Sequence, residues 1–105
     1  MFKPTPMDFR ILELLPPVGL IGGVHWRGRF ANDISKEILE EIPDEDKQYV
    51  HINGLTVGSN LSLMLKENLV KSYPGKAKGN RLWARTPSGT ELLQKKNEIL
   101  NGYKA

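Results

Sequence analysis

Two stretches of the sequence carry side chains that could bind a partner. Between residues 55 and 69, small polar side chains interrupt a series of leucines; they are Thr56, Ser59, Asn60 and Ser62. Hydroxyl and amide groups can exchange hydrogen bonds with the polar edges of a closely approaching molecule. Between residues 71 and 85, every charged side chain is basic: Lys71, Lys76, Lys78, Arg81 and Arg85. A run of bases without an acid can neutralise a polyanion.

The acidic side chains gather in another part of the chain. From residue 33 to residue 46, Lys36 is the one base among the acids Asp33, Glu37, Glu40, Glu41, Asp44, Glu45 and Asp46. Charge separated in this way turns one face toward a polyanion and another toward water. A pair of solvated loops would produce the same pattern, so charge alone does not decide between the two interpretations.

The sequence offers no residue set for catalysis or for a metal ion. His25 and His51 are far apart and have no second ligand at the usual spacing, and cysteine is absent. The acidic run lacks the alternating aspartates of a calcium loop. The glycines between Gly19 and Gly23 do not form a dinucleotide-binding fingerprint. We therefore expect a protein that is not an enzyme and that uses neither a metal nor a cofactor.

Length and composition favour one globular domain over residues 1–105. Hydrophobic residues make up 39% of the chain and charged residues 26%, with a net charge of +3, which suits a single modest core. No apolar run reaches the roughly 18–20 residues that span a bilayer. Met1-Phe2-Lys3-Pro4 lacks the features of a signal peptide. We expect a cytoplasmic protein.

Hydrophobic periodicity predicts three helices before residue 70. The first begins at the capping sequence Thr5-Pro6-Met7-Asp8 and stops at Pro16-Pro17. The second runs from about 31–33 to 42, where Pro43 ends it. The third runs from about 55 to 69, after a turn or helix-start signal at Asn53-Gly54, and Asn68 suits the left-handed conformation at its end. Its apolar stripe is Val57, Leu61, Met64, Leu65 and Leu69.

The other segments predict extended structure and a last helix. Residues 18–30 are an irregular, glycine-interrupted connection, and residues 49–52 are expected to form a short strand. Residues 69–73 and 81–86 flank a turn rich in glycine and lysine, which predicts a β-hairpin. Thr86-Pro87 repeats the capped helix start, so one helix is expected over about 87–103.

The second half of the chain resembles the winged helix-turn-helix regulators of the MarR and PadR types. In these families the third helix ends on leucine, polar residues, glycine, leucine and valine, which compares here with residues 61–70 and with Asn68 in the glycine position. The return strand of the wing compares with Trp83-Ala84-Arg85-Thr86-Pro87-Ser88-Gly89. Arg85 stands where these families have a buried leucine, so either its strand shifts or its guanidinium is paired.

The resemblance implies an α+β, mainly α fold: a winged helix-turn-helix with a three-helix core, a β-hairpin wing at about 70–86 and a C-terminal helix at about 87–103. It also implies a nucleoid-associated transcriptional regulator of a prokaryote or virus that binds double-stranded DNA. Helix 55–69 would read the major groove, and the wing 71–85 would contact the backbone or minor groove. The residues expected at the DNA are Thr56, Ser59, Asn60, Ser62, Leu63, Lys66, Lys71, Tyr73, Lys76, Lys78 and Arg81.

Individual residues carry further expectations. Asn60 suits a bidentate contact to adenine if it points outward, and Leu63 suits either a thymine methyl group or packing under the wing. Trp83 is expected in the core, and Trp26, with Arg27 and Arg29, either anchors its loop or contacts DNA. A homodimer could form through the last helix, whose apolar residues are Leu92, Leu93, Ile99, Leu100 and Tyr103.

Two other functions fit the same pattern. The fold could serve as a protein–protein adaptor in a larger assembly, since a winged helix does not by itself imply DNA binding. It could also belong to a replication or packaging protein that binds DNA with little sequence preference.

Overall fold

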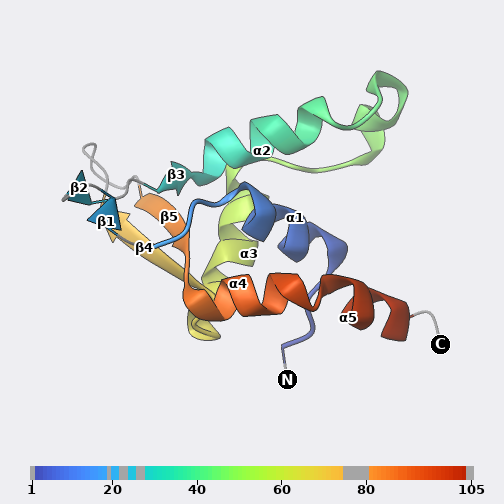
Figure 1. Cartoon of the computed structure of the whole chain (residues 1–105). Coiled ribbons are helices and arrows are strands. Elements are labelled where there is room, and N and C mark those ends of the chain that lie inside the picture. The colour runs from blue at the N-terminus through green and yellow to red at the C-terminus, as the bar shows by residue number, and fades with distance from the viewer. Residues whose placement is uncertain (1, 19, 22–23, 26–27, 75–80, 104–105) are drawn as a thin grey trace.

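The computed structural model of the chain describes residues 2–18, 20–21, 24–25, 28–74 and 81–103 (Figure 1). It is an α+β, mainly helical globule with a three-stranded antiparallel sheet. The elements follow in the order α1 (Pro6–Leu14), β1 (Leu20–Ile21), β2 (Val24–His25), β3 (Arg29–Phe30), α2 (Ala31–Glu40), the 3-10 helix η1 (Asp44–Tyr49), α3 (Gly54–Lys66), β4 (Val70–Pro74), β5 (Arg81–Arg85), α4 (Pro87–Gln94) and α5 (Lys96–Gly102).

Side-chain caps set the starts of α1 and α3, as the sequence predicts. In α1 the Thr5 hydroxyl accepts a hydrogen bond from the backbone N–H of Asp8, and the Asp8 carboxylate accepts one from the N–H of Thr5 at 2.9 Å. In α3 the Asn53 side chain accepts from the N–H groups of Leu55 and Thr56, at 2.9 and 3.1 Å. These bonds satisfy donors that a helix start leaves unpaired.

The left-handed conformation predicted for Asn68 is confirmed, although α3 ends three residues before the predicted 69. The helix stops at Lys66, and Asn68 has a φ of 61°, a left-handed conformation that asparagine tolerates better than most residues. The N–H of Leu69 then bonds to the carbonyl of Met64 at 2.9 Å, which closes the helix and turns the chain into β4.

The predicted hairpin is the main part of the sheet. Strands β4 and β5 pair from Val70↔Arg85 to Pro74↔Arg81, and β3 adds to the other side of β5, so the order is β3-β5-β4. Gly28 allows this third strand to enter, because a Cβ there would lie 2.3 Å from the carbonyl oxygen of Trp83. Strands β1 and β2 form a separate small hairpin, which projects from the end of the molecule where β4 and β5 also lie (Figure 1).

The core lies where α1, α2 and α3 meet the inner face of the sheet. Its buried side chains come from every one of these elements: Ile11, Leu12, Leu15, Ile34, Ile38, Val57, Leu61, Met64, Leu69, Val70 and Trp83. The expected burial of Trp83 is confirmed, since 7% of it is exposed. The expectation for Leu65 is wrong: its side chain is 42% exposed, because it lies at the flank of the helix and not over the core.

Two predicted elements differ from the structure. Residues 44–49 form a 3-10 helix instead of leading into a strand, because the N–H of Asp46 bonds back to the carbonyl of Pro43 at 2.9 Å. Residues 50–52 pair with no strand among the described residues. The single last helix is instead two helices, since Lys95 departs from helical geometry with φ −95° and ψ 6°.

Within the described part of the chain, we find no helix that combines the length and apolarity needed to cross a bilayer.

Candidate nucleic-acid interface

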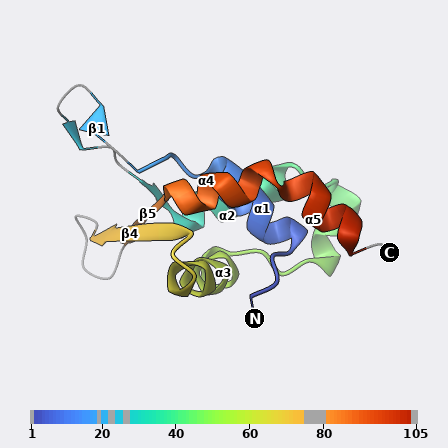
Figure 2. The same ribbon diagram turned by 60° about the horizontal axis from the view of Figure 1, so that its bottom comes forward.

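The outward face of α3 is polar except for one leucine. Val57, Leu61 and Met64 turn into the core, and a 3.6-residue period places the opposite face on Leu55, Ser59, Ser62 and Lys66. All four of these side chains are exposed. Figure 2 shows α3 on one side of the molecule and α4 on the other, so the C-terminal helices do not cover this face.

An open groove of about 680 Å³ lies beside this face. One wall is formed by residues 30–33, where β3 runs into α2. The other wall is α3, through Leu55, Gly58, Ser59 and Ser62, and β5 contributes Arg81 and Trp83. The groove therefore joins α3 to β5, the second strand of the hairpin. Asp33 also contributes to the groove lining, so the groove contains one acid as well as the cation of Arg81.

Arg81 is held in place by the neighbouring strand. Its Nε and Nη2 atoms donate hydrogen bonds to the hydroxyl of Ser72, at 3.1 and 2.8 Å. The side chain is nevertheless exposed, so its remaining N–H groups can reach an anion. A guanidinium with a planar fork of donors is well suited to a phosphate.

The structure brings together Ser59, Ser62 and Arg81 of the expected DNA-binding residues. Ser62 is exposed, and the hydroxyl of Ser59 donates to the carbonyl of Leu55 at 3.0 Å, which leaves its oxygen free to accept. Lys66 lies on the same face one turn further along α3. Leu63 is 54% exposed, but it is not among the residues that line the groove.

Thr56 and Asn60 have structural partners. The hydroxyl of Thr56 accepts from the N–H of Asn53 at 2.9 Å and donates to its carbonyl at 3.0 Å, which completes the cap of α3. The side-chain amide of Asn60 donates to the Asp8 carboxylate on α1 at 2.9 Å. Asn60 therefore points toward α1. It does not have the outward orientation that the predicted adenine contact requires, so that prediction is wrong.

Lys71 and Tyr73 belong to the other face of the hairpin. Successive side chains of a strand alternate between faces, and Lys71 pairs with Ala84 while Ser72 pairs with Trp83. The Lys71 ammonium lies 5.6 Å from the centre of the Tyr73 ring, so these two side chains contact each other and not the groove. Lys76 and Lys78, like Trp26 and Arg27, lie outside the described residues.

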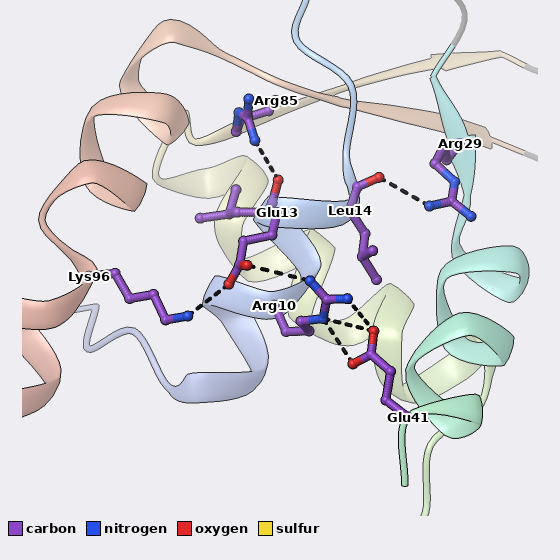
Figure 3. A network of polar contacts seen from close by, with 8 residues as sticks. Arg10, Glu13, Leu14, Arg29, Glu41, Arg85 and Lys96 are labelled. Atoms are coloured by element: carbon purple, nitrogen blue, oxygen red, sulfur yellow. Dashed lines mark hydrogen bonds and ion pairs between the residues drawn. The ribbon is translucent and has the colours of Figure 1, made fainter.

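Two further arginines hold the helices and the sheet together (Figure 3). Arg85 donates from Nη1 to the carbonyl of Leu12 and from Nε to the hydroxyl of Thr90, both at 2.8 Å. Of the two alternatives for this residue, the paired guanidinium is therefore the one observed. Arg29 donates to the carbonyl of Leu14 at 3.2 Å and forms an ion pair with Glu37 at 2.6 Å, so it serves as an anchor between elements.

Much of the acidic charge lies away from the groove. The C-terminal half of α2 and η1 are at the end of the molecule opposite the hairpin (Figure 1). There Arg10 binds Glu41 through several hydrogen bonds, including one from Nε at 2.9 Å. This hydrogen bond holds the pKa of Glu41 below its usual value, and the pKa of Arg10 is raised for the same reason. A salt bridge to Lys47 likewise lowers the pKa of Asp44.

The expected dimer surface is partly used inside the chain. Leu92 and Leu93 pack against the core, and Ile99 and Leu100 are half-buried. Tyr103 is 41% exposed and lies under the Lys3 ammonium, which is 4.5 Å from the centre of its ring. The homodimer stays a prediction.

Sequence reasoning missed Leu55 as a groove residue. The signal was present, because an apolar stripe on Val57, Leu61 and Met64 leaves Leu55 in phase with Ser59, Ser62 and Lys66 on the opposite face. Gly58, on the flank of the helix, lines the groove together with Arg81 and Trp83 of β5.

Comparisons of the chain with protein-family models, with curated proteins and with solved structures find no match. The functional argument therefore rests on the geometry of the chain itself.

Proposed function

We propose that this chain is a winged helix-turn-helix protein that binds double-stranded DNA, with α3 in the major groove and the β4–β5 hairpin as the wing. The element order supports the proposal, since α1, α2 and α3 precede the hairpin and a short strand before α2 completes the sheet. The observation that carries it is the shared groove of Ser59, Ser62 and Arg81.

The shape of this surface suits a duplex. A major groove about 12 Å wide accepts an α-helix, and small side chains on the outward face of α3 allow the helix axis to come near the base edges. The hydroxyls of Ser59 and Ser62 can bond to bases or to phosphates. Arg81, at the side of the same groove, is positioned for the phosphate backbone.

Charge also favours this orientation. Lys66 and Arg81 are exposed on the α3–hairpin side, and much of the acidic charge of α2 and η1 lies at the other end of the molecule (Figure 1). An approaching duplex is therefore attracted to the side that carries α3 and is repelled by the acidic end.

Salt-dependent binding to a random-sequence duplex, followed by fluorescence anisotropy, tests the proposal. If about four to six phosphates are neutralised, the logarithm of affinity should fall against the logarithm of salt with a slope of roughly −4 to −5. Arg81→Glu should weaken binding and reduce this slope by about 1.

Lys95→Glu is the matched control, because it makes the same change in charge at the junction of α4 and α5, away from α3 (Figure 2). Equal losses in the two variants would show that net charge and not the groove governs binding. If Arg81→Glu binds the duplex as tightly as the parent, the hairpin is not part of the interface.

Regulation requires sequence preference in addition to affinity. Selection of bound duplexes from a random pool separates a regulator from a packaging or replication protein. A sharp consensus with two-fold symmetry would support a regulator that binds as a dimer, whereas duplexes without a consensus would support low-specificity binding.

One observation favours the adaptor function. Leu55 is 83% exposed and Leu63 54% exposed on α3, and exposed apolar side chains are typical of protein contacts. The same anisotropy titration decides between the two functions: an adaptor would show no salt-dependent affinity for any duplex.

A further inference from the structure

Two residues on the groove side of α3 have no explanation within the fold. Leu55, directly after the cap of α3, is 83% exposed, more than Tyr49 at 76%. Gly58, one turn later, sits in the middle of a helix, where glycine is less stable than alanine. Both line the groove beside Ser62 and Arg81.

The surroundings of Gly58 contrast with those of two other glycines. A Cβ at Gly28 would lie 2.3 Å from the Trp83 carbonyl oxygen, and one at Gly89 would lie 2.2 Å from the Leu69 carbonyl oxygen. The fold therefore requires glycine at these two positions. A Cβ at Gly58 would meet no atom within 4 Å outside its own stretch of helix, so the fold does not require glycine here and the position opens onto the groove.

The face around Leu55 is suited to one kind of partner. Among the α3 residues that line the groove, Leu55 has the one large apolar side chain, and it lies beside the hydroxyls of Ser59 and Ser62. The major-groove edge of an A·T base pair combines the same kinds of group, since the thymine methyl is its one apolar group among hydrogen-bond donors and acceptors. The cation of Arg81 lies in the same groove, and Lys66 lies one turn beyond Ser62 on α3; both cations suit the phosphates of a duplex.

We propose that Leu55 contacts thymine methyl groups in the major groove and that Gly58 provides the clearance for the DNA backbone beside it. The inference rests on the proposed function, and it makes Leu55 a specificity-determining residue of α3. It assigns to Leu55 the thymine contact that the sequence alone suggested for Leu63.

Deoxyuridine tests the methyl contact directly, because it differs from thymidine by the C5 methyl group alone. The probe is a duplex that the parent protein recovers from a random pool, with each thymine replaced in turn by uracil. At one position or more, the replacement should weaken binding of the parent about four-fold, the value of one buried apolar carbon. In Leu55→Ala the same replacement should have no further effect, while Leu63→Ala should keep the full effect.

Gly58→Ala tests the clearance without risk to folding. The variant should raise the midpoint of thermal unfolding by about 4–8 °C and weaken duplex binding at least ten-fold. Gly102→Ala is the control, because a Cβ at Gly102 on α5 also meets no atom within 4 Å, and it should bind like the parent.

The outcomes separate this inference from the function on which it rests. If no duplex is bound at all, both fail. If duplexes are bound but Leu55→Ala keeps the uracil effect, or if Gly58→Ala binds as tightly as the parent, DNA binding stands and the assigned roles of these two residues are wrong.

Discussion

Arg85 should contribute more to stability than any exposed ion pair of this protein. Its half-buried guanidinium donates one hydrogen bond to the carbonyl of Leu12, near the end of α1, and another to the hydroxyl of Thr90 in α4. Arg85→Met keeps most of the aliphatic stem and removes both bonds. It also leaves two partly buried acceptors without this donor, which is the costly part of the change.

The expected loss follows from these two bonds. A hydrogen bond with a charged donor contributes about 1.5–3 kcal/mol, and we reduce this to about 1–1.5 kcal/mol for each of the two bonds because water can replace part of it at a half-buried site. Arg85→Met should therefore lower the free energy of unfolding by about 2–3 kcal/mol. For a domain of this size, the thermal midpoint should fall by on the order of 10–20 °C.

Urea denaturation followed by circular dichroism measures this loss, and Arg10→Met provides the control. Arg10 makes more hydrogen bonds than Arg85, all of them to Glu41 and Glu13 at the surface. Because solvent screens this exposed cluster, its replacement should cost less than about 1 kcal/mol. Equal losses in the two variants, or a loss below about 0.5 kcal/mol in Arg85→Met, would refute the argument that burial and not the number of bonds sets the contribution.

Two further predictions concern close packing and pH. Gly89→Ala should destabilise the fold by about 1–3 kcal/mol, because its Cβ would lie 2.2 Å from the Leu69 carbonyl oxygen; a thermal midpoint equal to that of the parent would contradict this close approach. The hydrogen bond from Arg10 lowers the pKa of Glu41, so the ionised carboxylate stabilises the fold above pH 4.5, its usual pKa, and this contribution is lost as the pH falls through the lowered pKa. Glu41→Gln should therefore be less stable than the parent at pH 7, by less than about 1 kcal/mol, and the two thermal midpoints should converge on acidification; a constant difference down to pH 2 would mean that the ionised pair contributes nothing.

Local structure was largely predictable from neighbouring residues. Thr5 and Asn53 cap α1 and α3, Pro16 and Pro43 follow the ends of α1 and α2, and Asn68 adopts the left-handed conformation. Each of these features depends on the backbone preference or the hydrogen bonds of a few adjacent residues. For the same reason the hairpin of β4 and β5 agrees with its prediction within one or two residues.

Errors arose where a distant partner decides the outcome. Residues 49–52 have apolar and β-branched side chains, but a strand needs an edge to pair with, and no described strand reaches them. Asn60 has the same helical phase whether or not Asp8 is near, and only the packing of α1 against α3 turns its amide inward. The sequence left open whether the guanidinium of Arg85 is paired, and only the packing of α1 and α4 against β5 supplies the groups that accept its hydrogen bonds.

The candidate site was also predictable from the sequence only in part. The amino-acid sequence by itself determined that α3 has a polar outward face with Ser59, Ser62 and Lys66, since helical period and the apolar stripe leave no other orientation. Tertiary structure alone decided that Arg81 and Gly58 share a groove with this face, because the pairing of β5 with β3 and the packing of α2 on α3 are long-range contacts. Sequence patterns report the period of one element, whereas a binding surface depends on how several elements are packed together.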